Sequence, residues 1–204
     1  EAAVLDLYQG TWAGTLTREE TTDAFTDQAV FTHPGRGVDG YTEAKMNPSG
    51  GYMDMQWFSW TQLYPYIRSA NIAIQKLTEN EGGLNASLTK RLLGEAYFMR
   101  GYFFTQLMRQ YGGIVLLTEP LTLESEAENP RSSFEATINQ IISDIDQSIS
   151  LLDGAPQDKA RAHKITALAL KSRVLTHAAS DLYEPSKVGG VSTLSSYGCW
   201  MLAL

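Results

Sequence analysis

The apolar residues between positions 134 and 152 recur at the spacing of one face of an α-helix. They follow one another at intervals of four, three, one, three, four and three, and they are Phe134, Ile138, Ile141, Ile142, Ile145, Ile149 and Leu152. Ser132 and Glu135 match a Ser-x-x-Glu capping box, and Gly154 and Pro156 are stop signals. The pattern predicts an amphipathic helix that must bury its apolar face against other elements.

The segment from Leu88 to Tyr111 has apolar residues on more than one helical face. This distribution is typical of a central, buried helix. Gly94 and Gly101 would let neighbouring helices approach it closely. Glu95 and Arg100 are expected to be buried there, so they should form a structural ion pair or bond to loop carbonyls.

Two further segments also have helical periodicity. Between Trp57 and Leu77 apolar residues lie three or four apart, and Pro65 predicts either a kink or a helix that begins near Tyr64. A last helix is predicted to carry its apolar face on the following residues: Ile165, Leu168, Ala169, Ser172, Leu175, Ala179 and Leu182.

These helices predict an all-α fold of antiparallel helix pairs in a tetratricopeptide-like array, with long irregular loops at the N-terminus. We divide the chain into three parts. Residues 1–56 form an irregular N-terminal region with a short helix, residues 57–184 form the helical core, and residues 185–204 form an atypical tail that is either truncated or altered.

Charge and composition exclude several classes of protein. The formal net charge is −7, and the 16 basic residues are scattered among 23 acidic ones, so a nucleic-acid-binding surface is not expected. No apolar run approaches the roughly 20 residues that span a bilayer. The first residues lack the pattern of a signal peptide, which predicts that any export signal has been removed or never existed.

The sequence has no recognisable catalytic or metal-binding motif. His33, His163 and His177 stand in no nucleophile or zinc motif, and Cys199 is the single cysteine. We therefore predict no catalytic residue, no metal and no cofactor. His163 is interpreted as a helix-start residue and His177 as a residue of a helix surface.

Aromatic residues in loops are the best candidates for binding a ligand. Sugars pack flat C–H faces on aromatic rings, and binding residues concentrate on loops that a rigid scaffold supports. Trp12, Tyr41, Tyr52 and Trp57 lie in or beside the irregular N-terminal region. We predict these four as ligand-binding residues.

Five segments, in order, resemble those of the SusD/RagB family of outer-membrane nutrient-binding lipoproteins. Trp60–Asn71 is similar to the family's Trp-x-x-Leu-Tyr-x-x-Ile-x-x-Ala-Asn helix. Gly94–Phe104 resembles its Gly-Glu-Ala-x-Phe-Leu-Arg-Ala-x-x-Phe stretch, with Gly101 in place of the alanine. The remaining matches are Tyr111–Leu116, Arg131–Glu135 and Arg161–Lys164.

The resemblance implies a non-enzymatic lipoprotein exposed on the surface of the bacterial outer membrane. Members of the family capture an oligosaccharide or polysaccharide, in some relatives a peptide, for a SusC-like TonB-dependent transporter. The lipid anchor would be attached to an N-terminal cysteine that this sequence lacks. Family members are also much longer than 204 residues.

Two alternatives from other classes remain at this point. A helical-repeat scaffold would bind a protein or peptide partner in its groove and take no small ligand. An all-helical hydrolase would need a pair of carboxylates that are distant in sequence.

Overall fold

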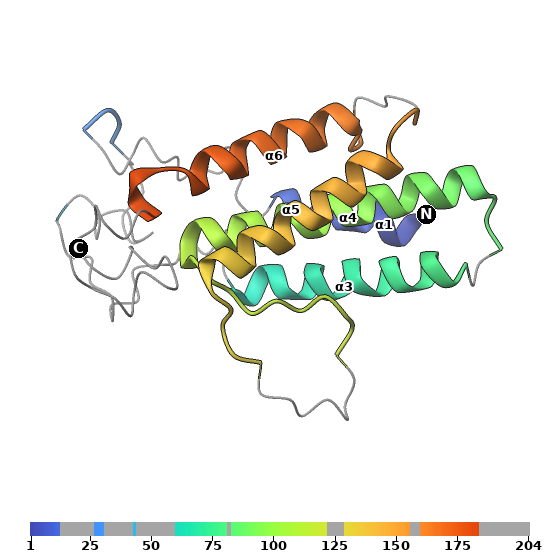
Figure 1. The fold of residues 1–204 in the computed structure, drawn as a ribbon, viewed down its shortest axis with the longest axis horizontal. Helices are drawn as coiled ribbons and strands as arrows, with labels where there is room; N and C mark the ends of the chain where they lie inside the picture. Colours follow the sequence, from blue (N-terminus) through green and yellow to red (C-terminus); the bar gives the residue numbers. More distant parts are fainter. Residues whose placement is uncertain are drawn as a thin grey trace.

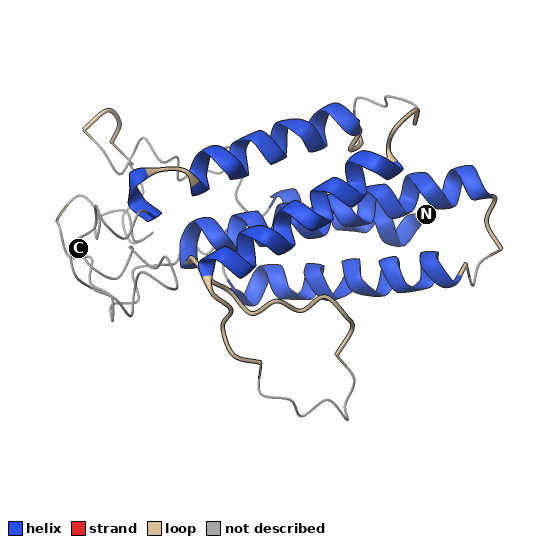
Figure 2. Ribbon diagram, viewed as in Figure 1, coloured by secondary structure: helices blue, strands red, loops and turns tan. Residues whose placement is uncertain are grey.

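The computed structural model describes residues 1–12, 27–30, 43, 60–80, 83–121, 129–155 and 160–183. Every regular element in these residues is a helix, as Figure 2 shows. The α-helices are α1 (Ala2–Leu7), α3 (Trp60–Glu79), α4 (Ala86–Tyr111), α5 (Phe134–Leu151) and α6 (Lys164–Ala178), and the 3₁₀ helices are η1 (Tyr8–Trp12) and η3 (Asp181–Tyr183).

Helices α3, α4, α5 and α6 run antiparallel, each to the next (Figure 1). Helix α4 is central and contacts α1, α3, α5 and α6. The predicted all-α, tetratricopeptide-like array of antiparallel pairs is therefore confirmed. The division of the chain into three parts stays a prediction.

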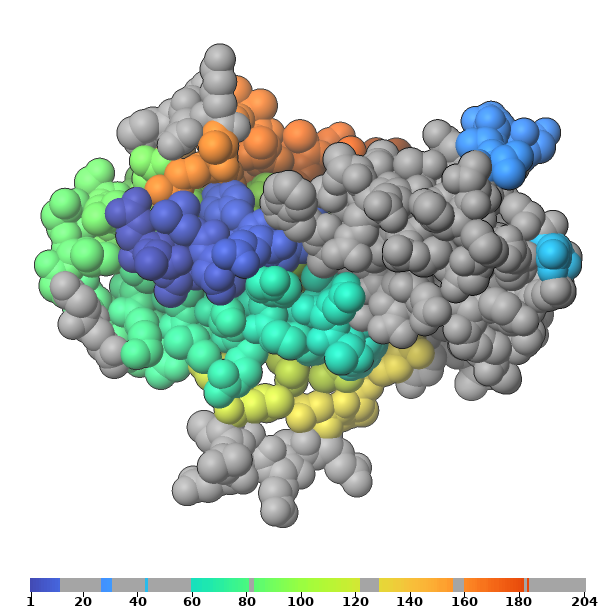
Figure 3. All heavy atoms as spheres, turned by 180° about the vertical axis from the view of Figure 1, so that it is seen from behind, coloured from blue at the N-terminus to red at the C-terminus, as the bar shows by residue number. Residues whose placement is uncertain are grey.

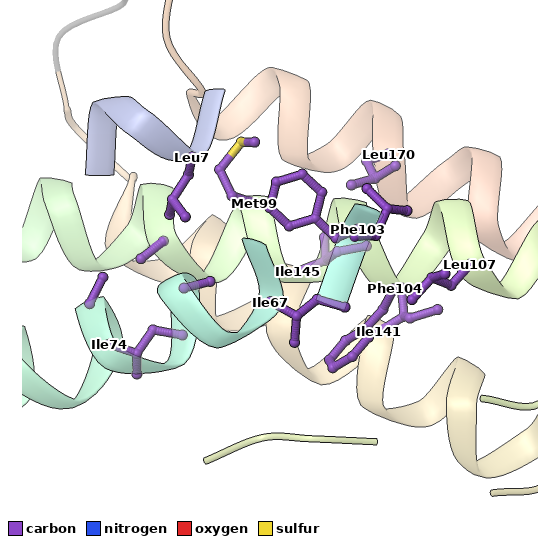
Figure 4. Close-up of a cluster of buried hydrophobic side chains, with 14 of the residues drawn as sticks. Leu7, Ile67, Ile74, Met99, Phe103, Phe104, Leu107, Ile141, Ile145 and Leu170 are labelled. Atoms are coloured by element: carbon purple, nitrogen blue, oxygen red, sulfur yellow. The ribbon is translucent and has the colours of Figure 1, made fainter. Parts of the chain in front are cut away.

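The core is built around α4, whose buried side chains point to several sides of the helix (Figure 4). Met99, Phe103 and Phe104 pack there with Ile141 and Ile145 of α5. The whole predicted stripe of α5 belongs to this core or packs against it, except Leu152, which is buried just beyond the helix. Both periodicity predictions are confirmed.

The glycines of α4 allow close packing, as predicted. A Cβ atom added to Gly94 would lie 2.8 Å from Cγ of Leu152, and one added to Gly101 would lie 3.3 Å from Cγ1 of Ile145. The Leu152 side chain therefore packs more closely against Gly94 than alanine would permit without a shift.

The cap of α5 differs from the prediction by one residue. Ser133, not Ser132, is the N-cap, and its Oγ accepts a hydrogen bond from the Ala136 N–H at 3.1 Å. The Ser132 N–H instead donates to the Ile114 carbonyl at 2.8 Å. Because the Ser132 backbone pairs with Ile114, Ser132 lies outside the helix and does not cap it. His163, by contrast, is the N-cap of α6 as expected, with Thr166 completing a capping box.

Helix α3 begins at Trp60, so the expected start near Tyr64 is wrong by about one turn. Pro65 lies inside the helix, in its second turn. A proline there lacks the N–H that would bond to the carbonyl of the residue four positions earlier. Packing of the buried residues Leu63 and Ile67 on either side holds the helix through that position.

The predicted face of α6 is also wrong, because the helix buries the opposite side. Ala167, Leu170 and Val174 face α4 and α5 and are buried. Ile165, Leu168 and Leu175 belong to the predicted face and are exposed. Both faces of α6 are apolar, so periodicity does not determine which one packs inward.

Helix α1 lies against α3 (Figure 3). The buried carboxylate of Glu95 holds the N-terminal segment through Tyr8, which follows α1. Glu95 of α4 is fully buried and accepts from the Tyr8 hydroxyl at 3.0 Å and from Arg91 Nε at 3.1 Å. Arg161 donates to it through Nε and Nη2 at 3.0 and 2.8 Å. The Tyr8 oxygen also accepts from the Ala162 N–H at 2.8 Å.

We expect Tyr8→Phe to lower the free energy of unfolding by about 1–3 kcal/mol, because Glu95 loses a donor and a backbone N–H loses its acceptor. Urea unfolding followed by circular dichroism measures the change. Tyr66→Phe is the matched control, since the Tyr66 ring packs on Phe103 at 5.6 Å and is retained. Equal midpoints for the two variants would contradict the expectation.

Candidate ligand-binding surface

The four predicted ligand residues fall outside the part that the structure describes. Tyr41, Tyr52 and Trp57 are not among the described residues. The backbone of Trp12 ends η1, and its side chain is likewise outside the description. Their role stays a prediction, and the surface described next is built from other residues.

A buried ion pair connects α4 to α5. The Arg100 guanidinium binds Asp144 at two points, Nε to Oδ2 at 2.8 Å and Nη2 to Oδ1 at 2.6 Å. The side chains are 6% and 2% exposed. Burial raises the pKa of the Asp144 carboxyl, and the hydrogen bonds from Arg100 oppose that rise.

The same arginine fixes the segment that follows α4. Arg100 Nη1 donates to Asn71 Oδ1 and to the Thr118 carbonyl, both at 2.9 Å. The Asn71 amide in turn donates to the carbonyls of Leu117 at 2.7 Å and Glu119 at 3.2 Å. Segment 114–121 is thereby held along α3.

The first turns of α3 hold the start of that segment. The Tyr64 hydroxyl donates to the Val115 carbonyl at 2.7 Å, and burial raises the pKa of Tyr64, which keeps the hydroxyl a neutral donor. Its ring centroid lies 4.7 Å from that of Trp60, whose ring also meets Tyr111 edge-on at 5.5 Å. An aromatic cluster therefore stands where α3 begins.

A hollow of about 320 Å³ lies between α3 and segment 114–121. We call it the α3 hollow, and its lining is Tyr64, Pro65, Arg68, Asn71, Leu117, Glu119 and Leu121. Arg68 and Glu119 are exposed, and Leu121 is 41% exposed. The hollow thus has an aromatic and apolar wall, and the exposed charged residues Arg68 and Glu119 are among its lining residues.

Two larger hollows have a different character. One, of about 510 Å³, lies between α1 and α3 and is lined by Val4, Ala73 and Lys76 among others. The other, of about 520 Å³, lies at the N-terminal end of α4 beside Asp153. Among the described residues that line these two hollows, none is aromatic. Of the three, the α3 hollow has the features that sugar-binding sites use.

Two searches of the described residues bear on other chemistries. No group of three or more His, Cys, Asp or Glu side chains suited to a metal ion occurs among them. None of the described helices is both long and apolar enough to cross a bilayer.

Glu95 and Arg100 are both buried and paired, as expected. They do not pair with each other, however, and each has its own set of partners. Glu95 bonds to Tyr8, Arg91 and Arg161, while Arg100 bonds to Asp144, Asn71 and a loop carbonyl.

Sequence reasoning missed Arg68 and Glu119. Each is an exposed charge that matches no binding motif, and only the path of segment 114–121 along α3 brings them to one hollow.

The chain matches known proteins over most of its length. Residues 12–175 match the model of the SusD-like_3 family, described as "Starch-binding associating with outer membrane". SusD-like protein P38 of Formosa agariphila is 30% identical over 142 residues, which cover 69% of this chain and 27% of that protein. The chain therefore spans only about a quarter of that relative.

Solved structures have the same fold. A SusD-like protein from Bacteroides fragilis is 25% identical with a TM-score of 0.62, over 89% of this chain and 34% of that one. A laminarin binding SusD-like protein is 21% identical with a TM-score of 0.68, over 88% of this chain and 39% of that one. The resemblance predicted from the sequence motifs is confirmed, and the chain belongs to the SusD-like family.

Proposed function

We propose that this protein captures an oligosaccharide at the surface of the bacterial outer membrane and passes it, uncleaved, to a SusC-like TonB-dependent transporter. Membership of a family described as starch-binding and outer-membrane-associating is the observation that carries the proposal. The similar structure of a laminarin-binding protein supports a glycan as the ligand. A lipid anchor at the N-terminus of the mature protein belongs to the same proposal.

We further propose that the α3 hollow binds part of the glycan. Its apolar wall suits the C–H face of a sugar ring, with Tyr64 as the aromatic member. Arg68 and Glu119 then stand as a donor and an acceptor for hydroxyl groups. A ligand-binding role for the predicted loop residues Trp12, Tyr41, Tyr52 and Trp57 belongs to the same proposal.

The first test is retardation of the protein on native gels that contain soluble polysaccharides, with circular dichroism to confirm helix content. Retardation by one glycan supports capture. Reducing ends released from that glycan would contradict binding without cleavage. Binding only to a protein partner, with no glycan retarding a helical sample, would favour the scaffold alternative instead.

The α3 hollow is tested by Arg68→Ala. A hydrogen bond from a charged group is worth about 1.5–3 kcal/mol, so the Kd for the retarding glycan should rise about 10-fold or more. Calorimetric titration with the matching oligosaccharide measures it. Arg173→Ala, at an exposed arginine of α6, is the matched control. An unchanged Kd for Arg68→Ala would place the glycan elsewhere.

A further inference from the structure

The segment that lines one side of the α3 hollow has no secondary structure of its own. All residues of segment 114–121 are described, and none of them lies in a helix or a strand. Every second residue of its second half, namely Leu117, Glu119 and Leu121, lines the hollow. This alternation is that of an extended chain, whose successive side chains point to opposite sides. The place of these lining side chains therefore depends on what holds the backbone of the segment.

Side chains of α3 and α4 hold that backbone at three successive carbonyls. The Asn71 amide nitrogen donates to the carbonyls of Leu117 at 2.7 Å and Glu119 at 3.2 Å. Arg100 Nη1 donates to the Thr118 carbonyl between them at 2.9 Å. Asn71 also accepts from Arg100 through Oδ1 at 2.9 Å, so its side chain joins the segment to the buried ion pair of α4.

The geometry of Asn71 suits a residue that positions other groups and does not contact the ligand itself. Asn71 is only 2% exposed, although it belongs to the lining of the hollow. A side-chain amide has two N–H donors, and the two carbonyls account for both. A sugar hydroxyl would therefore find no free donor on this side chain.

Asn71 also determines how two charged lining residues lie relative to each other. Arg68 precedes Asn71 by three positions on α3, and residues three apart share one face of a helix. The bond from Asn71 to the Glu119 carbonyl ties the segment to that face. The distance between Arg68 and Glu119 across the hollow is thus set through the Asn71 amide.

We propose that Asn71 is the positioning residue of the glycan site, which holds Glu119 in place relative to Arg68 without touching the sugar. The proposal rests on the proposed function of the α3 hollow. Asparagine suits this position because two carbonyls need donors while Arg100 needs an acceptor. A carboxylate would supply the acceptor alone, and leucine would supply neither.

The test is a double-mutant cycle of Asn71→Asp and Glu119→Ala, with the glycan that retards the unsubstituted protein. Calorimetric titration gives the Kd of each variant. Each single substitution should raise the Kd about 10-fold or more, since each removes the contribution of a charged hydrogen-bonding group. The double variant should bind about as weakly as either single one, because a Glu119 that is no longer held in place contributes nothing further.

Two further variants separate positioning from a general loss of stability. Tyr8→Phe, which acts on the Glu95 network, is the control and should leave the Kd unchanged. Asn71→Leu is similar in size and uncharged, and it takes the place of Asn71→Asp if circular dichroism shows that the aspartate variant does not fold.

A spin label gives a second measurement that needs no glycan. A nitroxide attached to Glu119→Cys in a Cys199→Ser background reports how firmly the segment is held. Its electron paramagnetic resonance spectrum should show greater mobility with Asn71→Asp than without it, whereas Tyr8→Phe should leave the spectrum unchanged. Local release of a segment is seen without global unfolding.

The outcomes distinguish this proposal from the proposed function. If the unsubstituted protein binds no glycan, both fail. If it binds but Glu119→Ala leaves the Kd unchanged, the glycan lies elsewhere and the positioning role fails with the α3 hollow. Additive losses in the cycle, an equal rise in Kd for Tyr8→Phe, or unchanged label mobility would overturn the positioning role alone. Non-additive losses together with a more mobile label support it.

Discussion

Arg100→Met is expected to lower the free energy of unfolding by about 3–5 kcal/mol, because it leaves a buried carboxylate without its partner. Asp144 is 2% exposed and would keep only the bond from Gln140, at 3.0 Å. Asn71 and the Thr118 carbonyl would also lose a donor. Urea unfolding followed by circular dichroism gives the change.

The matched control is Lys171→Met, which removes another ion pair of α5. Lys171 bonds to Asp146 at 2.6 Å, but the two side chains are 30% and 50% exposed. An exposed pair contributes about 0–1 kcal/mol. Similar losses of unfolding free energy for the two variants would mean that burial does not determine how much the Arg100–Asp144 pair contributes to stability.

The loss of unfolding free energy caused by Arg100→Met should be smaller at acidic pH. Burial already raises the pKa of Asp144, and loss of the arginine should raise it further. A carboxyl whose pKa is higher in the folded than in the unfolded protein destabilises the fold above its folded pKa, and this cost fades as the pH falls through that value. The stability gap to the unmodified protein should therefore narrow as the pH falls through the folded-state pKa of Asp144 towards the lower pKa of the unfolded protein. A constant gap would show that Asp144 does not take up a proton.

Gly113→Ala is expected to cost about 3 kcal/mol or more, because overpacking adds to lost hydrogen bonds. A Cβ atom at residue 113 would lie 2.1 Å from the Ser132 carbonyl oxygen. That atom belongs to the backbone and cannot rotate away. Separation of the two segments would break the bond from the Ser132 N–H to the Ile114 carbonyl and the bond from Arg131 Nε to the Gly113 carbonyl.

Gly101→Ala is the control for this substitution. Its Cβ would lie 3.3 Å from Cγ1 of Ile145, which needs only a small shift, and alanine favours a helix over glycine by about 1 kcal/mol. The variant should be as stable as the parent or more so, in keeping with the alanine of the family pattern. Thermal unfolding of both variants measures the contrast. A Gly113→Ala protein with an unchanged midpoint would contradict the expected clash.

The sequence predicted which type of residue would bind the glycan, but not where the binding residues lie in the fold. Aromatic residues in loops are recognisable because their composition is local, but their placement depends on loop conformation. The α3 hollow joins Arg68 to Glu119, which lie about fifty residues apart in sequence. The contacts that join them pass through Asn71 and Arg100. A single sequence contains no signal that Arg68 and Glu119 line the same hollow.

Sequence alone determined the helices, the central position of α4 and the inward stripe of α5, because the periodicity of apolar residues is a local property and only one face of α5 is apolar. Tertiary structure decided what local patterns leave open. Helix α6 is apolar on both sides, so its packed face depends on which side meets α4 and α5. Glu95 and Arg100, five positions apart, point to different sides of a helix and cannot pair. Their partners Arg161 and Asp144 come from distant segments, which only the folded chain brings within hydrogen-bonding distance.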